Sequence, residues 1–362
     1  MYPRIEIDLD KLKHNATLLS KKCRKHNIEA AVVTKVYCAF PEIVDYIKDS
    51  GVKYIADSRI KNLKKLRSID LEKILIRIPM ITEIEDVVKY SDISLNSEFE
   101  VIKKIDETCA KLNKKHKIAL MVDLGDLREG YFKEEELFEV VGKIIKLENI
   151  EFVGLGTNLT CYGAVIPSRE NLGRLCKLGE KIEEKFDIKL SFISGGNSSS
   201  LHLLDKGEMP DRVTNLRLGE AIALGKETAY SQDIKGAYQD AFKLVCEIVE
   251  LKEKPSIPIG EIGVDAFGNK PYYEDKGIRK RAIVGIGKQD INIDGMSTVD
   301  PKQEILGASS DHLIVDVTDS KKDYKVGDTI EFNLEYGALM AATTSDYVEK
   351  VFKCEEKLAE NV

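Results

Sequence analysis

Within the first 230 residues, short apolar runs alternate with segments of helical periodicity, and this alternation limits the possible folds more than any other feature. Eight runs occur, at residues 30–33, 54–56, 74–78, 93–95, 118–122, 152–155, 190–193 and 213–216. Eight strand–helix units predict an α/β fold, an N-terminal (β/α)8 TIM barrel. A doubly wound open sheet is the alternative, because periodicity does not show whether a sheet closes. Thr82 with Glu85 and Ser97 with Glu100 have capping-box spacing, which predicts helix starts at Thr82 and Ser97.

The pattern changes after about residue 230, where β-rich runs punctuated by Pro and Gly replace the alternation. These runs lie at residues 243–249, 281–286, 312–317 and 329–332. A chain of 362 residues is also longer than one core usually supports. We therefore expect a barrel over residues 10–230 and a mostly β domain over residues 231–362, which the strand at residues 1–9 joins.

Composition narrows the class of protein. No apolar run is long enough to cross a bilayer, and the N-terminus lacks the apolar segment of a secretory signal. The seven cysteines are scattered without CxxC spacing, which is typical of reduced thiols in a cytoplasmic protein without a zinc site. The net charge of −7 is spread along the chain without a basic block. We expect a cytoplasmic protein with no metal site and neither nucleic acid nor membrane as partner.

Lys35 follows the first apolar run, at the place where a chain leaves a parallel sheet for a loop. A lysine there either extends its charge into solvent or, if desolvated, serves as a nucleophile that forms a Schiff base with a carbonyl. TIM-barrel active sites lie at the C-terminal ends of the strands. The residues that follow the other runs at the same rim therefore decide between the two interpretations.

Glycines and hydroxyl side chains follow the seventh run, in the segment Gly195-Gly196-Asn197-Ser198-Ser199-Ser200. Glycines let a ligand approach the backbone closely, and amides at a helix start favour a phosphate. Gly219, after the eighth run, adds a further amide at the place where barrels often bind phosphate. The alternative is a flexible loop with a serine cap.

Two arginines, Arg128 and Arg217, follow or end the fifth and eighth runs. Rim arginines usually form salt bridges. Alternatively, one binds a substrate carboxylate through two hydrogen bonds and the other donates to a nitrogen of a cofactor ring.

The order of these features resembles the alanine racemase family of fold-type III pyridoxal-phosphate enzymes over nearly the whole chain, and within it the ornithine and diamino-acid racemase branch. The resemblance rests on Lys35, on Asp123-x-Gly125-x-x-Arg128-x-Gly130, on Ser194-x-x-Asn197-Ser198 and on Arg217-x-Gly219. It implies that Lys35 carries pyridoxal 5'-phosphate and is the catalytic residue. The other implied cofactor contacts are Asn158, Asn197, Ser198, Arg217, Gly219, Glu220 and Tyr347, and the implied substrate contacts are Arg128, Ser310 and Asp311.

The chain departs from the family pattern at four positions. One is Ala39, which stands where alanine racemases place a tyrosine a few residues after the cofactor lysine. Asn158 stands where the family has a ring-stacking histidine, and Met121 where relatives have a lysine that can be carbamylated. Ile259 stands where the family has the tyrosine that serves as second base. The second base is therefore left open among a tyrosine, Asp311 and His312. Acidic residues of the β domain such as Asp265 and Asp290 are candidates for binding a distal ammonium group.

The resemblance implies an enzyme, a pyridoxal-phosphate-dependent isomerase that interconverts L and D amino acids. Ornithine, or another diamino acid such as lysine, is the expected substrate. It further implies a head-to-tail homodimer in which the β domain contributes to the active site. The alternatives are an alanine racemase, a fold-type III D-amino-acid lyase, a non-catalytic pyridoxal-phosphate-binding protein, and a barrel in which Lys35 is structural.

Overall fold

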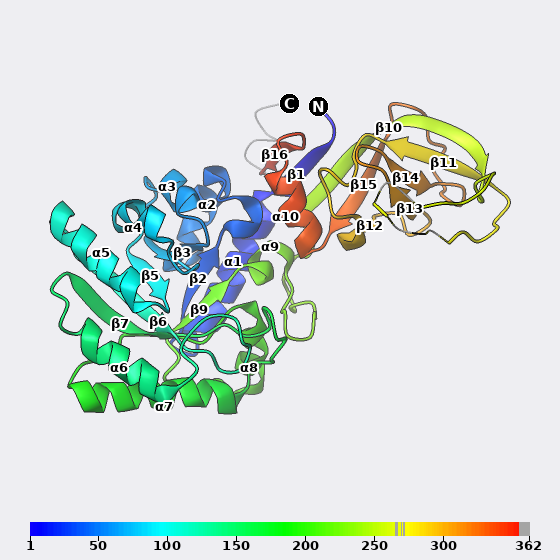
Figure 1. The fold of residues 1–362 in the computed structure, drawn as a ribbon. Coiled ribbons are helices and arrows are strands. Elements are labelled where there is room, and N and C mark those ends of the chain that lie inside the picture. Colours follow the sequence, from blue (N-terminus) through cyan, green and yellow to red (C-terminus); the bar gives the residue numbers. More distant parts are fainter. Residues whose placement is uncertain (265–266, 269, 271, 355–362) are drawn as a thin grey trace. The chain divides into compact units, whose positions relative to one another are not determined.

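A computed structural model describes residues 1–264, 267–268, 270 and 272–354. Eight parallel strands close into a barrel in the order of the sequence (Figure 1). They are β2 (Glu29–Val33), β3 (Tyr54–Asp57), β4 (Glu72–Leu75), β5 (Ile93–Asn96), β6 (His116–Met121), β7 (Ile150–Gly156), β8 (Phe192–Ser194) and β9 (Asn215–Leu218). The last strand pairs with the first, with Ala31 opposite Arg217. The closed barrel confirms the TIM-barrel prediction and excludes the open sheet.

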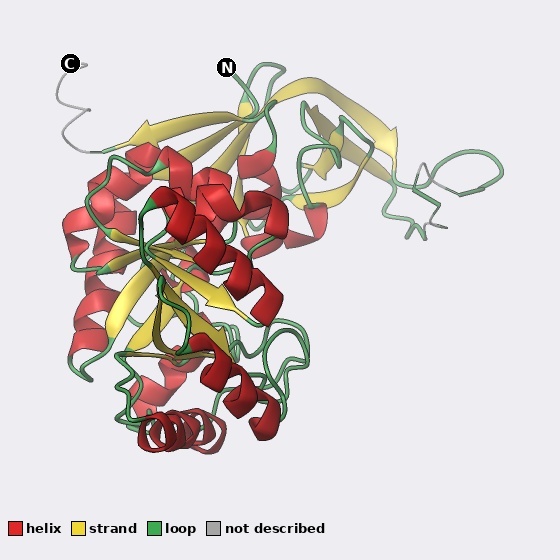
Figure 2. Cartoon of the chain, turned by 60° about the vertical axis from the view of Figure 1, so that its left-hand side comes forward, coloured by secondary structure: helices red, strands yellow, loops and turns green. Residues whose placement is uncertain are grey.

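Helices follow the strands and surround the barrel (Figure 2). They are α1 (Leu9–Arg24), α2 (Pro41–Ile47), α3 (Ile60–Lys65), α4 (Ile84–Tyr90), α5 (Phe99–Leu112), α6 (Glu134–Ile144), α7 (Arg169–Phe186), α8 (Leu201–Lys206) and α9 (Glu220–Leu224). The longer helices bury one apolar face; α5, for example, buries Ile102, Ile105 and Cys109. None of the described helices is long and apolar enough to cross a membrane.

The two predicted capping boxes are wrong. The helix α4 begins at Ile84 with Glu83 as its N-cap, and α5 begins at Phe99 with Glu98 as its N-cap. Neither cap residue bonds the helix through its side chain. Both helices begin two residues after the predicted cap residue, and a 3-10 turn, η3 (Ile81–Glu83), that includes Thr82 precedes α4.

Side chains fill the barrel interior. Inward-facing residues from seven of the strands form one buried cluster of Ala31, Val33, Tyr54, Ala56, Ile74, Ile93, Leu95, Ala119, Met121, Val153 and Phe192. The rings of Tyr54 and Phe192 meet edge to face, with centroids 6.2 Å apart. Because the interior is packed, a ligand can bind only at an end of the barrel.

The remainder of the chain forms a second compact unit, which consists of Met1–Asp8 and Asp240–Val362. Its sheet has the order β12-β15-β10-β11-β14-β13, and β1 pairs with both β10 and β16. The strands are β1 (Arg4–Asp8), β10 (Phe242–Pro255), β11 (Ile278–Val284), β12 (Met296–Thr298), β13 (Glu304–Ala308), β14 (Leu313–Asp316), β15 (Thr329–Leu334) and β16 (Glu349–Lys353). The described residues of this unit also form the α-helix α10 (Tyr336–Thr344).

Candidate active site

Lys35 lies at the C-terminal end of β2, where the chain enters the short 3-10 turn η1 (Lys35–Tyr37). Its side chain keeps access to solvent, but the surrounding protein removes enough water to lower the pKa of the ammonium group. Cys161 and Asp57 oppose this decrease in pKa, whereas the positive charges of Arg128 and Arg217 add to it. The structure therefore brings Lys35 together with both arginines that the sequence indicated.

The turn that carries Lys35 is held by a buried carboxylate that sequence reasoning missed. Asp57, at the end of β3, accepts a hydrogen bond of 2.6 Å from the hydroxyl of Thr34, which directly precedes Lys35. It also accepts from the backbone N–H of Arg59 and the side chain of Asn62. Burial raises the pKa of Asp57 although these bonds oppose the rise. The arrangement fixes the backbone from which the lysine extends.

Arg217 is almost completely buried at the end of β9. Its guanidinium donates to the hydroxyl of Ser194, to the carbonyl oxygen of Thr157 at 2.8 Å and to Oδ1 of Asn158 at 2.5 Å. Desolvation lowers the pKa of Arg217 to about 10. Three acceptors at the ends of two neighbouring strands, β7 and β8, hold the planar group in one orientation. The guanidinium has five N–H donors, so it can also donate to a ligand.

Arg128 lies in the loop after β6 and is paired with its neighbour Glu129. Both Nε and Nη2 of Arg128 donate to the carboxylate of Glu129, with 2.6 Å between Nη2 and Oε1. This hydrogen bonding raises the pKa of Arg128. The side-chain amide of Asn158 donates to Oε1 of the same carboxylate at 2.6 Å. Asn158 therefore connects Arg217 to Glu129 and, through Glu129, to Arg128.

The Gly/Ser segment after β8 forms a compact turn. Asn197 caps the 3-10 turn η4 (Ser198–Ser200) by accepting from the N–H of Ser199 at 2.9 Å. The hydroxyl of Ser198 accepts from the N–H of Ala221 in α9, which joins this turn to the segment after β9. Gly196 adopts a φ of +104°, a conformation that side chains with a Cβ rarely take.

This segment also contains an unsatisfied hydroxyl. Oγ of Ser199 is buried and, among the described residues, has no hydrogen-bond partner. A buried polar atom without a partner is costly, so a donor of this kind calls for an acceptor at the site. The donor set comprises a desolvated amine, a fixed buried guanidinium and a serine turn with an unused hydroxyl. These residues fit a phosphorylated aromatic aldehyde such as pyridoxal phosphate.

Three predicted site residues belong to the other unit. Ser310 and Asp311 lie in the exposed turn between β13 and β14, where Asp311 pairs with His312 at 3.1 Å. That hydrogen bond from His312 lowers the pKa of Asp311. Tyr347 is exposed between α10 and β16. The roles of all three stay predictions.

Other candidates for the substrate side chain and the second base also lie in this unit. Asp290 accepts from the hydroxyl of Ser345 at 2.7 Å, and Asp265 lies outside the described residues. Ile259 is 93% exposed in the loop after β10. Within the described part of the chain, no group of three His, Cys, Asp or Glu side chains could hold a metal ion.

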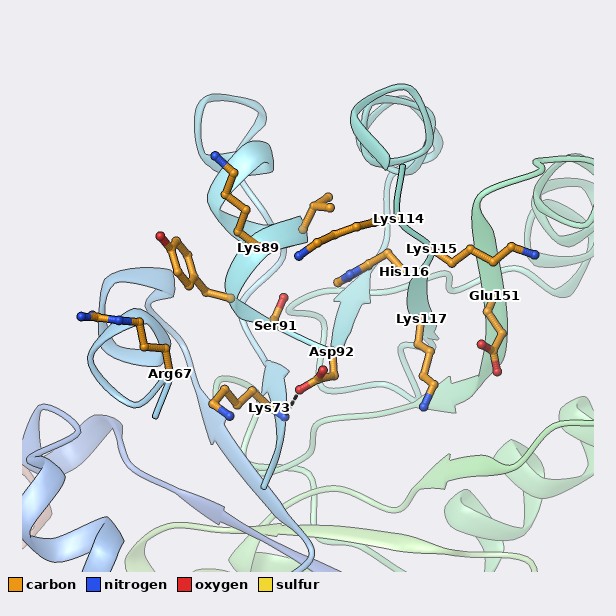
Figure 3. Close-up of a pocket in the computed structure, with 12 residues that line it drawn as sticks. Arg67, Lys73, Lys89, Ser91, Asp92, Lys114, Lys115, His116, Lys117 and Glu151 are labelled. Carbon is orange, nitrogen blue, oxygen red and sulfur yellow. Dashed lines mark hydrogen bonds between the residues drawn. The ribbon is translucent and has the colours of Figure 1, made fainter. Parts of the chain in front are cut away.

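A cavity of about 490 Å3 lies at the opposite end of the barrel, among the N-terminal ends of β4 to β7 (Figure 3). Its cationic lining residues are Arg67, Lys73, Lys89, Lys114, Lys115 and Lys117. Protein groups already engage four of them. Lys73 and Arg67 donate to backbone carbonyl oxygens, Lys89 pairs with Glu85, and Lys117 pairs with Glu72. Because TIM-barrel chemistry occurs at the C-terminal ends of the strands, we assign the active site to the rim that carries Lys35.

Comparisons with known proteins support the family resemblance. A family model described as "Alanine racemase, N-terminal domain" matches residues 7–226. The chain is 58% identical over 350 residues to the ornithine racemase of Acetoanaerobium sticklandii, which covers 97% of this chain and 99% of the relative. It is 39% identical over 355 residues to the lysine racemase of Thermotoga maritima, and this alignment covers 98% of this chain and 99% of the relative.

A solved structure shares the whole fold. The alanine racemase from Bartonella henselae, described with covalently bound pyridoxal phosphate, superposes with a TM-score of 0.72 at 17% identity, covering 97% of this chain and 99% of that one. At that identity the likeness concerns the fold alone. The chain belongs to the alanine racemase family, which confirms the resemblance inferred from its motifs.

Proposed function

We propose that this protein is a pyridoxal 5'-phosphate-dependent racemase of ornithine. The observation that carries the proposal is the 58% identity, over nearly the full length, to a protein named as an ornithine racemase. The placement of Lys35, Arg128 and Arg217 at one rim of the barrel supports it independently. Lysine is the second candidate substrate, because the relative at 39% identity is named as a lysine racemase.

Lys35 would hold the cofactor and later move the proton. Bound pyridoxal phosphate supplies an aldehyde that links to amines and an electron-withdrawing ring that acidifies the α proton of a linked amino acid. The lowered pKa of Lys35 increases the fraction of neutral amine, and only the neutral amine can attack the aldehyde or accept a proton. Lys35 would therefore act on one face of the α carbon.

Arg217 favours racemisation over reactions in which the negative charge left by the α proton must be stabilised for a long time. A guanidinium keeps its protons and only donates hydrogen bonds, so a ring nitrogen that faces Arg217 must accept and stay unprotonated. An unprotonated ring withdraws less charge, so a proton removed from the α carbon is returned promptly. The three hydrogen bonds that fix Arg217 keep it in this donor orientation.

Arg128 would bind the substrate carboxylate, and the Gly/Ser turn with Asn197, Ser198, Gly219 and Glu220 would bind the phosphate. Asn158 would contact the cofactor ring, and Tyr347 the phosphate. In this proposal the barrel, residues 10–230, binds the cofactor in the cytoplasm. The β domain, residues 231–362 with the strand at 1–9, contributes Ser310, Asp311 and the second acid/base to a head-to-tail homodimer.

The proposal is tested by incubating the purified protein and pyridoxal phosphate separately with L-ornithine, L-lysine and L-alanine. Chiral chromatography follows the D isomers. We expect rapid formation of D-ornithine, slower formation of D-lysine and little D-alanine. D-alanine as the main product would replace the proposed substrate, and no racemisation of any of the three would refute the proposed activity.

A further inference from the structure

We propose that Glu129 is a positioning residue that sets Arg128 for the substrate carboxylate and couples it to Arg217. The inference rests on the proposed function, and it assigns a role to a residue that the motif comparison did not single out. Arg128, Glu129, Asn158 and Arg217 form one continuous set of hydrogen bonds, called here the four-residue network.

Glu129 occupies one side of the Arg128 guanidinium and leaves the other side available. The carboxylate engages Nε and Nη2, so the edge formed by the two terminal nitrogens can still form a second pair of parallel hydrogen bonds. A substrate carboxylate fits that edge. The Arg128 side chain is 39% exposed and Glu129 only 17%, so the arginine reaches outward from a more enclosed partner.

The backbone beside Glu129 is fixed, which makes it a suitable anchor. Gly130 follows it with a φ of +122°, and a Cβ there would lie 2.7 Å from the backbone nitrogen of Asp123. The next residue, Tyr131, donates its N–H to the carbonyl oxygen of Met121 at the end of β6, at 2.8 Å. The loop therefore contacts the barrel again at Gly130, and this contact fixes the backbone position of the neighbouring Glu129.

Glu129 also separates two positive charges. The charge of Arg128 lowers the pKa of Arg217, whereas the charge of Glu129 raises it. The side-chain amide of Asn158 lies between Glu129 and Arg217: its oxygen accepts from Arg217 and its nitrogen donates to Glu129. Without the carboxylate, the two guanidinium groups would repel each other and the Asn158 amide would lose its acceptor.

A diamino substrate raises a second possible role, because its distal ammonium needs an anionic or polar partner. Glu129 already accepts two hydrogen bonds from Arg128 and one from Asn158. Its charge is thus compensated by an adjacent cation. The geometry therefore assigns Glu129 to the carboxylate end of the substrate and not to its ammonium end.

The experiment compares the wild-type holoenzyme with Glu129→Gln and with a control, Glu139→Gln. Glu139 pairs with Lys143 on the exposed face of α6, so its replacement also removes an ion-paired carboxylate, but one outside the site. Each protein is titrated with L-ornithine, L-norvaline and 1,4-diaminobutane while the cofactor absorbance is followed. Norvaline lacks the distal ammonium group, and diaminobutane lacks the carboxylate.

We expect Glu129→Gln to weaken the binding of ornithine and norvaline by about tenfold or more, equivalent to about 1.4 kcal/mol. Binding of diaminobutane should change less than about twofold, and Glu139→Gln should match the wild type. In racemisation assays, KM for ornithine should rise more than kcat falls.

Three outcomes overturn the inference. Unchanged binding of all three ligands would reduce the Arg128–Glu129 pair to a surface ion pair. Weakened binding of ornithine but not norvaline would move Glu129 to the ammonium end. Equal weakening of all three would indicate general disruption. If the wild type binds these ligands but does not racemise ornithine, the proposed function fails, while the binding comparison still tests Glu129.

Discussion

The guanidinium of Arg217 and the side-chain oxygen of Asn158 are joined by a hydrogen bond of 2.5 Å. Replacing Asn158 with Leu keeps the size of the side chain but removes this acceptor from an arginine that is 2% exposed. A buried charged donor that loses a partner costs about 1–3 kcal/mol. We expect that loss in urea unfolding of Asn158→Leu, together with weaker cofactor binding. If Asn158→Leu kept the stability and the cofactor affinity of the wild type, Ser194 and Thr157 alone would be sufficient to hold Arg217.

The depressed pKa of Lys35 predicts a pH-dependent cost in the cofactor-free protein. In the unfolded chain Lys35 titrates near 10.5, and in the folded protein below that value. Between the two values the unfolded chain binds more protons, so stability rises with pH, and below both the cost is fully present. Lys35→Met should therefore unfold at a higher temperature than the wild type at pH 7. The difference should shrink as pH approaches 10.5, and a lower unfolding temperature for the variant would contradict the depressed pKa.

His116 predicts a loss of stability at acidic pH. This residue is buried at the start of β6, where it bonds the hydroxyl of Ser94 at 2.9 Å, and desolvation lowers its pKa to about 4. Because the unfolded value is near 6.5, stability is fully present above pH 6.5 and decreases as pH falls toward 4. The wild type should lose about 3 kcal/mol more than His116→Gln over that interval, measured by denaturant unfolding. If the stability of the wild type and that of His116→Gln changed equally with pH, the folded protein would accommodate a protonated His116, which would contradict the lowered pKa.

Gly154 lies where two barrel strands approach each other closely. A Cβ at this position would lie 1.7 Å from the carbonyl oxygen of Phe192, next to an irregularity in the pairing of β6 with β7. Gly154→Ala should lose about 3 kcal/mol or more of unfolding free energy, or fail to fold. Gly173, in the second turn of α7, has open space around its Cβ position. Gly173→Ala should gain about 0.5–1 kcal/mol, and the same sign of change for both variants would contradict this packing.

The sequence predicted the barrel well because each of its strands is a short apolar run with an interval of helical periodicity after it. Closure itself needs the pairing of β2 with β9, a contact between distant segments that no local pattern encodes. The second unit was predicted less completely. The short strands β12, β13 and β16 and the helix α10 were missed, since three to nine residues carry little periodicity.

Among the candidate site residues, the sequence pointed to Lys35, Arg128 and Arg217 because they follow predicted strands, and the family resemblance pointed to Asn158. It did not point to Asp57 or Ser199 as site groups of their own. The role of Asp57 depends on a hydrogen bond from Thr34 at the end of the neighbouring strand, and sequence patterns do not show such a contact. The role of Ser199 depends on its buried hydroxyl having no hydrogen-bond partner among the described residues. Glu129 was passed over because an acid beside an arginine normally indicates a surface ion pair.

The most direct measurement follows L-ornithine in deuterated water with the wild type and Lys35→Ala, each supplied with pyridoxal phosphate. Proton removal and return at the α carbon must introduce one solvent deuterium into each D-ornithine molecule formed, which mass spectrometry and chiral chromatography detect together. The account predicts D-ornithine carrying deuterium at the α carbon for the wild type and none for Lys35→Ala. D-ornithine formed at a comparable rate by Lys35→Ala, or formed by the wild type without deuterium, would contradict it.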